Sequence, residues 1–369
     1  MDATPSRIDW TSQWSDIKLA LRQDRIIYCY VLFTCVSLYL LSRFTDHDLD
    51  IKYDIFSYLR SLLNMCYVSF LTWSVYYYCY LLYHRASHPL VKYVKRIISF
   101  FQPISKALSF ILLILVLNFT LSSYTYLKTI IPDLHPFEYD LAFYEFDKWL
   151  HFGVSPWELT HAVFSHHYAT FVINFFYHLW FLLMWGALLF FIIDRKSKRL
   201  RDQYLLSFLS SWLIVGGILA TIFSSAGPCY MHLLNPEHTY FLPLIDTLRI
   251  QSRELMEVGF PPVWAIDVQD SLWLRYLNRE GGVGVGISAM PSMHVSIAVL
   301  MALGASRKNK WLGRVMWANV VMIQIGSVHL AWHYAIDGYV SAFATILIWK
   351  GTGILLDRIN RFSSRHSIT

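Results

Sequence analysis

Long apolar runs separated by short polar segments dominate this chain. Several runs reach about twenty residues, the length that an α-helix needs to cross the hydrocarbon core of a bilayer. We predict about eight spanning helices, at residues 26–44, 61–83, 107–127, 169–193, 205–223, 293–306, 313–332 and 338–356. The pattern therefore predicts an all-α fold, a polytopic membrane helix bundle.

Two long segments between the predicted spans are too long to be simple connections. Residues 131–168 place Phe143, Phe146 and Leu150 at helical spacing, which predicts a helix along the membrane surface. Asp140 and Asp147 fall on its other face, where they either line an acceptor pocket or, as is more common, are solvated. Residues 224–290 are rich in proline and glycine and predict an irregular external cap with short helices.

These patterns divide the chain into four parts. Residues 1–25 predict a cytoplasmic N-terminus in which Ile8–Leu21 forms an amphipathic interfacial helix. Residues 26–106 predict two N-terminal transmembrane helices and a basic loop. Residues 107–356 predict a core that includes both external segments, and residues 357–369 a cytoplasmic tail.

Composition and charge agree with a membrane protein. Only 15% of the residues are charged, whereas a soluble domain carries about 25%. The net charge of +6 does not indicate a nucleic-acid partner, because the basic residues lie in alternate connections and not in one patch. The connections on one side hold Arg85, Lys92, Lys95, Arg96, Arg195, Lys196, Lys198, Arg199, Arg201, Arg307, Lys308, Lys310 and Arg314, with Arg358, Arg361 and Arg365 in the tail. The connections on the other side are richer in acid but keep Lys52, Arg60, Lys128 and Lys148, so the contrast is a bias. Since Lys and Arg mark cytoplasmic loops, both termini are predicted to be cytoplasmic.

Candidate chemistry begins at the predicted span 293–306. Pro291 and Ser292 suit a helix start, with Ser292 as the cap, and His294 follows in the first turn. A helix N-terminus binds phosphate through its free N–H groups and its dipole. Ser292 is therefore a candidate phosphate ligand, and His294 a candidate proton donor beside it.

A second histidine is paired with a carboxylate. His333 and Asp337 are four residues apart, so they share one face if this stretch is helical. The carboxylate then fixes the tautomer of the ring and leaves the other nitrogen free to attack. One span, a basic turn and a second span separate His294 from His333, which predicts that both lie on the same, non-cytoplasmic face.

These two motifs resemble those of the type-2 phosphatidic acid phosphatase superfamily. Pro-Ser-Met-His at 291–294 and His-Tyr-Ala-Ile-Asp-Gly at 333–338 are similar to its second and third motifs, most closely in the inositolphosphotransferase branch that includes inositol phosphorylceramide synthase. The resemblance implies a six-helix core, extended here by two N-terminal helices, and a metal-independent mechanism without cofactors. It also implies His333 as the nucleophile that becomes phosphorylated, Asp337 as its orienting residue and His294 as the acid and base.

The sequence departs from the phosphatases of that superfamily at two basic positions. Ser327 stands where they carry an arginine, and the first motif, residues 225–230, keeps Pro228 but has no basic residue. Such losses resemble the phosphotransferase branch. Candidate substrate-binding residues are therefore Pro228, Tyr230, Ser292, Arg249, Arg253, Arg275 and Arg279.

The sequence leaves several functions open. The leading one is a lipid phosphotransferase, in which a membrane lipid phosphate donates its phospho-group to a hydroxyl acceptor: a lipid, a polyol or a sugar. The alternative is a lipid phosphate phosphatase with water as the acceptor. A proton-coupled transporter would show inverted repeats, and a scaffold would not need the two histidines and the aspartate. Glu158 and His161 have the spacing of two metal ligands, but no partner set for a metal site is evident.

Overall fold

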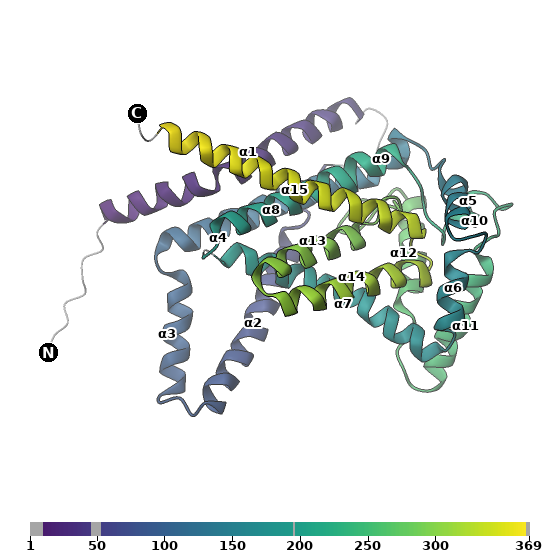
Figure 1. The fold of residues 1–369 in the computed structure, drawn as a ribbon, viewed down its shortest axis with the longest axis horizontal. Helices are drawn as coiled ribbons and strands as arrows, with labels where there is room; N and C mark the ends of the chain where they lie inside the picture. Colours follow the sequence, from purple (N-terminus) through teal and green to yellow (C-terminus); the bar gives the residue numbers. More distant parts are fainter. Residues whose placement is uncertain (1–9, 46–52, 195, 367–369) are drawn as a thin grey trace.

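The computed structural model describes residues 10–45, 53–194 and 196–366. These residues are helical, with connecting turns and no strand among them (Figure 1), which confirms the predicted all-α fold. Five described helices are long and apolar enough to cross a membrane: Gln13–Phe44, Ile104–Leu134, His167–Ile193, Lys198–Ile222 and Ala335–Arg361. The other three predicted spans also form helices without meeting the same test, so the count of about eight spans stays a prediction.

The core of the bundle surrounds helix α13 (Met293–Lys308). It packs against α7 (His167–Ile193), α8 (Lys198–Leu213), α14 (Lys310–His329) and α15 (Ala335–His366). The eight consecutive residues Val295–Ala302 are all buried, as expected for a helix enclosed on every side. Near its other end, a Cβ at Gly304 would lie 2.8 Å from the Tyr204 ring. The start of α13, which carries His294, is thus fixed by a helix that is enclosed by four others.

One spanning helix of the core is irregular. After α8, the chain forms a π-helical segment, η1 (Ile214–Leu219), and a short α9 (Ala220–Ile222). Gly216 and Gly217 lie in η1, where added Cβ atoms would come within 2.6 Å of Tyr124 and 2.8 Å of Leu127. Both of those residues belong to α4 (Ile104–Leu134). The two glycines therefore allow η1 and α4 to approach closely, and π-helical segments are frequent at functional sites.

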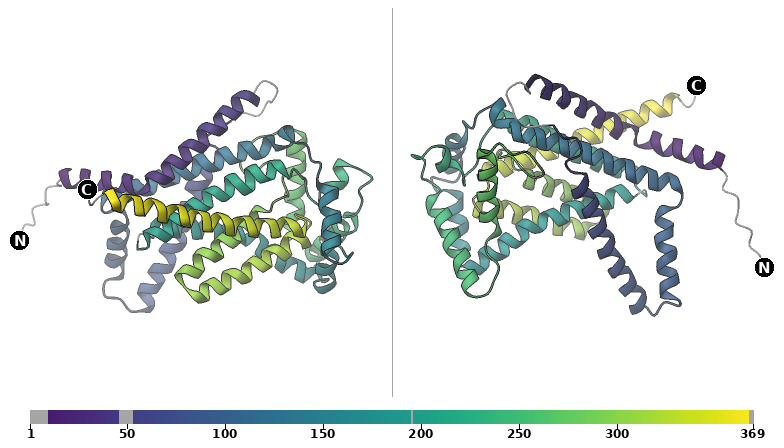
Figure 2. Two further views of the ribbon diagram at one scale, coloured as in Figure 1. Left: turned by 45° about the horizontal axis from the view of Figure 1, so that its top comes forward. Right: turned by 180° about the vertical axis from the view of Figure 1, so that it is seen from behind.

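The N-terminal helices lie outside this core. Helix α1 (Trp10–Thr45) packs on α4, whereas α2 (Leu59–Tyr83) and α3 (Pro89–Phe101) form a hairpin that projects from the bundle (Figures 1 and 2). The predicted amphipathic helix Ile8–Leu21 is continuous with the first span from residue 10 onward, and residues 1–9 lie outside the described residues. At the other end, α15 extends to His366, so most of the predicted tail 357–369 continues a helix, with residues 367–369 not described.

A buried ion pair joins α1 to the core. Arg201, which the charge pattern assigns to a cytoplasmic loop, is only 3% exposed, and its Nη1 lies 2.7 Å from Asp24 Oδ1. The Ser109 hydroxyl donates to the other oxygen of Asp24 at 2.7 Å. Removing one partner of such a pair leaves an uncompensated buried charge. Residues 10–25, the described part of the predicted N-terminal segment, are therefore attached to α4 and α8 through Asp24.

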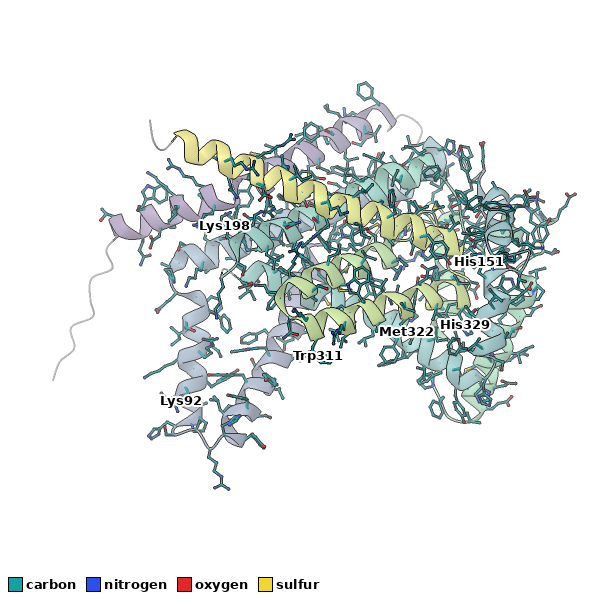
Figure 3. All side chains as sticks on the ribbon, in the orientation of Figure 1. Lys92, His151, Lys198, Trp311, Met322 and His329 are labelled. Carbon is teal, nitrogen blue, oxygen red and sulfur yellow. The ribbon has the colours of Figure 1, made fainter. Side chains whose placement is uncertain are left out.

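Residues 131–168 and 224–290 lie together at one end of the bundle, and we call this assembly the cap. They contain α5 (Asp140–Leu150), α6 (Pro156–Val163), α10 (Met231–Leu234), α11 (Leu242–Glu257) and α12 (Trp264–Leu277). Helices α5, α6 and α11 run across the ends of the core helices (Figure 1). His151 and His329 lie at this cap end, and Lys198 lies toward the other end (Figure 3). The starts of α13 and α15 both face the cap.

The acidic face of helix α5 is buried in the protein. Asp140 and Asp147 are buried, at 6% and 3% exposure, whereas Phe146 and Leu150 are 44% and 38% exposed. The common case of a solvated acidic face is therefore wrong here. The two carboxylates are buried because both accept hydrogen bonds from backbone N–H groups of the core. The outward apolar residues continue into Trp149, at 72% exposure, as expected for a helix at a membrane surface.

Candidate active site

His333 and Asp337 form a hydrogen bond, but not across one face of a helix. The helix α15 begins at Ala335, so His333 lies in the turn before it and Asp337 in its first turn. Asp337 Oδ2 lies 3.1 Å from His333 Nδ1 and also accepts from the Tyr334 N–H at 3.1 Å. The carboxylate thus reaches back over the helix start, as in a capping box. The expected pair is present with a different geometry, which leaves His333 Nε2 without a partner among the described residues.

His294 lies in the first turn of α13, as predicted. Ser292 caps that helix, because its hydroxyl oxygen accepts from the Val295 N–H at 3.4 Å. The imidazole stacks on Tyr177, with ring centroids 4.6 Å apart, and lies 4.3 Å from Trp180. Trp180 Nε1 also donates to the His294 carbonyl oxygen at 2.9 Å. Two aromatic rings of α7 therefore fix the orientation of an imidazole whose ring nitrogens make no hydrogen bond in the described part of the chain.

The two motifs meet at the cap end of the bundle. The ring centroids of His294 and His333 are 6.3 Å apart, with an interplanar angle of 61°. The Ser292 N–H donates to the Asp337 carbonyl oxygen at 3.2 Å, so the starts of α13 and α15 are directly connected. A phosphorus atom bonded to one ring nitrogen can present an oxygen to the other ring across this separation. Sequence spacing alone predicts that both histidines lie at the same end of the bundle. The structure shows in addition that the two motifs are in contact.

Asp147 positions the start of α15. Its two carboxylate oxygens accept from the N–H groups of Ala335 and Ile336, at 2.6 and 2.9 Å. These are donors that a helix start leaves without an internal partner, and an acid there also favours the helix dipole. Burial raises the pKa of this carboxyl, and the two N–H groups act in the opposite direction. Asp147 therefore holds the helix turn on which Asp337 lies.

Asp140 performs the same task for the first-motif loop, residues 225–230. It accepts from the N–H groups of Ala226 and Gly227, at 2.9 and 2.8 Å, and from the Tyr334 hydroxyl at 2.9 Å. Burial is again the main cause that raises the pKa of the carboxyl. Tyr334 immediately follows His333, so Asp140 joins the loop to the turn that carries the candidate nucleophile.

The first-motif loop packs against that turn. Cys229 N–H donates to the Ala331 carbonyl oxygen at 3.1 Å, and Pro228 is buried beside it. The Tyr230 hydroxyl donates to the Gln269 carbonyl oxygen at 3.0 Å, and the Gln269 side chain donates to the Leu330 carbonyl oxygen at 2.8 Å. Tyr230, predicted to bind substrate, therefore directs its hydroxyl to Gln269 in the middle of helix α12, which belongs to the cap. The loop backbone supports the turn 330–334.

Replacing Gly227 with alanine should disturb this support. Gly227 has φ +102°, and a Cβ there would lie 2.9 Å from the carbonyl oxygen of Trp332, the residue before His333. We expect a loss of about 1–3 kcal/mol in stability and a fall in turnover, measured by thermal unfolding and initial rates. The control is Gly351→Ala in α15, where nothing lies within 4 Å and helix propensity favours alanine. Wild-type stability and turnover in Gly227→Ala would show that the loop does not restrain His333.

The four arginines predicted to bind phosphate lie in the cap, and neither histidine is among the residues lining the cavities that they line. Arg249 is 53% exposed and lies 3.8 Å from Asp270, and with Arg253 it lines a cavity of about 570 Å³ between α11 and α12. Arg275 and Arg279, 45% and 57% exposed, pair with Glu280 and Asp133 and line a smaller cavity of about 240 Å³. The structure thus brings Ser292 to the two histidines but not these four arginines.

Comparison with known proteins places the chain in a family. A family model described as PAP2 superfamily matches residues 141–350, more than half of the 369 residues, and this range contains both histidines and Asp337. The chain belongs to the PAP2 superfamily. Comparisons with curated proteins and with solved structures give no match. Membership supports phosphatase-type phosphoryl transfer as the class of activity of this PAP2-superfamily membrane protein.

His161, one member of the possible metal pair Glu158 and His161, makes other contacts within the PAP2-superfamily fold. The His161 ring stacks on His329 at 3.8 Å, and its Nε2 lies 3.1 Å from the His329 carbonyl oxygen. Burial lowers the pKa of His161. Among the described residues, no group of three or more His, Cys, Asp or Glu side chains is arranged to hold a metal ion.

Proposed function

We propose that this protein is an integral membrane phosphotransferase that moves a phospho-group from a lipid phosphate, through His333, to a hydroxyl acceptor on the non-cytoplasmic face. One observation carries the proposal. His333 is hydrogen-bonded to Asp337 through Nδ1, and the His333 ring lies beside a second imidazole, that of His294, at the start of a helix. A nucleophile, an orienting carboxylate and a proton-transfer group are the parts that covalent phosphoryl transfer requires.

In the first step, His333 Nε2 attacks the phosphorus and the ester P–O bond breaks. The electron pair of that bond leaves with the lipid oxygen, and His294 donates the proton that this oxygen takes up. The product on the protein is a phosphohistidine. Asp337 accepts the hydrogen bond from Nδ1–H throughout, which stabilises the positive charge that develops on the ring. The N–H groups of Met293 and His294, at the start of α13, are available to the phosphate oxygens.

In the second step, the acceptor hydroxyl gives its proton to the now neutral His294 and attacks the phosphorus. The P–N bond breaks, and its electron pair returns to His333. An alcohol acceptor gives a new phosphate ester, whereas water gives free phosphate. The second candidate, a lipid phosphate phosphatase, uses the same residues and differs only in this acceptor, and the PAP2 family match supports it equally.

The environment of His333 favours the phosphotransferase. Ser327, where related phosphatases carry an arginine, is buried, and its carbonyl oxygen accepts from the N–H groups of Trp332 and His333, both at 3.0 Å. These hydrogen bonds use the Ser327 backbone, whereas its neutral side chain donates to the Ile323 carbonyl oxygen at 2.8 Å. The position therefore places no charge beside His333. Together with the first motif that lacks a basic residue, this supports the inositolphosphotransferase branch.

The test is a product assay on the purified full-length protein in lipid vesicles. Vesicles carrying a lipid with a ³²P-labelled phosphate are incubated with no added alcohol, with a second lipid alcohol, and with a soluble polyol. We expect labelled phosphate to move to one of the alcohols faster than free phosphate appears. A chelator should leave the rate unchanged, because the two imidazoles supply the nucleophile and the proton transfer.

The outcomes separate the candidates. Free phosphate as the sole product, whichever alcohol is present, would establish the phosphatase and overturn the phosphotransferase. Activity that a chelator abolishes and added divalent metal restores would overturn the metal-free mechanism. If label neither leaves the lipid nor becomes bound to the protein, the protein does not act on that class of lipid phosphate.

A further inference from the structure

The candidate active site needs a positive charge that the predicted residues do not supply. Phosphoryl transfer develops negative charge on the oxygens of the phosphate, and enzymes stabilise it with positioned cations and donors. The four cap arginines are directed elsewhere, and Asp337, the acid nearest the histidines, adds negative charge. A basic side chain that reaches His294 from another helix would supply this charge.

The face of α4 that carries Tyr124 points to the start of α13. A Cβ at Gly216 would lie 2.6 Å from the Tyr124 ring and 3.0 Å from the Met293 sulfur, so these three residues are in contact. Lys128 lies four residues after Tyr124 on the same helix, so it shares that face, one turn nearer the cap end. The lysine is therefore directed toward the residue pair Met293 and His294.

A second contact holds Lys128 from the cap side. A Cβ at Gly286, which has φ +95°, would lie 3.1 Å from Lys128 Cγ and from its backbone oxygen. Gly286 belongs to the segment that leads to the second motif. The absence of a side chain there lets that segment pass directly over the lysine. Lys128 is partly buried in α4 beneath this segment.

Three basic side chains lie around the His294 imidazole: His333, Lys128 and His178. The Asp337 carboxylate is hydrogen-bonded to His333 Nδ1. None of the carboxylates in the described residues lies within ion-pair distance of Lys128. An ionisable group in a membrane helix without a partner is costly to bury, and such groups usually mark a functional site. The arrangement suits an anion that binds between Lys128 and the two histidines.

We propose that Lys128 binds the non-bridging oxygens of the substrate phosphate, and so replaces the basic residues that the first motif of this chain lacks. This inference rests on the proposed function and adds to it a residue from a different helix. The ammonium donates to the phosphate while His333 attacks, and it stays protonated through both steps. Its role is to bind and stabilise charge, whereas proton transfer remains with His294.

The competing explanation is that Lys128 extends to the membrane surface and contacts lipid headgroups, as lysines near helix ends often do. In that case its removal would alter neither the binding of a small phosphate analogue nor turnover. Orthovanadate separates the two explanations, since it imitates the transferred group and carries no lipid tail.

The experiment compares Lys128→Met, Lys128→Arg and the wild-type chain, each purified at full length. The control is Lys92→Met on the projecting helix α3, which removes an exposed lysine far from the histidines. Orthovanadate affinity is measured by calorimetry, kcat/KM with the lipid phosphate, and folding by thermal unfolding. We expect Lys128→Met to weaken vanadate binding at least tenfold and to lower kcat/KM by roughly a hundredfold. Lys128→Arg should retain part of both, and Lys92→Met should match the wild type.

The failure of this inference can be told from the failure of the proposed function. Unchanged vanadate affinity and kcat/KM in a folded Lys128→Met protein, beside an active wild type, would overturn the role of Lys128 alone. Loss of vanadate binding in Lys128→Met, beside a wild type that binds vanadate but shows no lipid turnover, would support the anion site and count against the proposed substrate. A wild type that neither binds vanadate nor turns over would overturn both.

Discussion

Replacing His333 with alanine should lower phosphoryl transfer by at least about a thousandfold and remove all covalent label from the protein. The physical reason is that, in the proposed mechanism, the free nitrogen of this ring attacks phosphorus, while Asp337 fixes its other nitrogen. The neighbouring groups that remain, His294 and the start of α13, can still bind phosphate but cannot form the covalent intermediate. The measurement is the initial rate with ³²P-labelled lipid phosphate, together with protein quenched in alkaline detergent and analysed for label that is stable in alkali and lost in acid.

The matched control for this prediction is His84→Ala. His84 is exposed at the end of α2, on the hairpin that projects from the bundle, so its loss should change neither rate nor label. Thermal unfolding of both variants shows whether the fold survives, since the His333 side chain is buried. A folded His333→Ala protein that still becomes labelled would place the nucleophile elsewhere.

The central residues of this site could be predicted from sequence because their signals are local. His294 beside a capping serine, and His333 four residues before Asp337, each fall within one turn of a helix start. What spacing could not show is that the chain leaves helix α14 before His333. Ala331 has φ +61°, and Trp332 and His333 donate back to Ser327. The histidine is therefore presented by a turn, and the carboxylate reaches it from the following helix.

The supporting residues could not be predicted from sequence because their contacts are distant along the chain. Asp147 binds Ala335 and Ile336, and Asp140 binds Tyr334, at separations close to two hundred residues. The sequence of helix α5 shows only that each acid lies on the face opposite to an apolar stripe, and such a face is usually exposed to solvent. The one available signal was that two acids two turns apart share the face that a surface helix would turn inward.

The proposed role of Lys128 also could not be predicted from the sequence. A lysine near the end of an apolar run is ordinarily assigned to the membrane interface, and nothing adjacent to it in sequence suggests a site. Its environment depends on Gly216 and Gly286, which approach α4 from two separate parts of the chain. The glycines that permit this close approach identify the environment of Lys128 only once the arrangement of the helices in space is known.

Replacing His294 with alanine should separate the two chemical steps. Its imidazole, fixed between Tyr177 and Trp180, supplies the proton that a lipid alkoxide needs to leave. A lipid phosphate should therefore be turned over about 10²–10⁴ times more slowly. An aryl phosphate such as p-nitrophenyl phosphate needs no such proton, because its leaving group is a stable anion.

With the aryl substrate, His294→Ala should still phosphorylate His333 and then stop, because no base activates the acceptor. We expect a rapid release of about one equivalent of nitrophenol per protein, followed by slow turnover, with phosphate retained on the chain. His333→Ala should show no such release, which ties the burst to the nucleophile. Equal losses with both substrates would show that His294 does not protonate the leaving group, because only a lost acid makes the penalty depend on the leaving group.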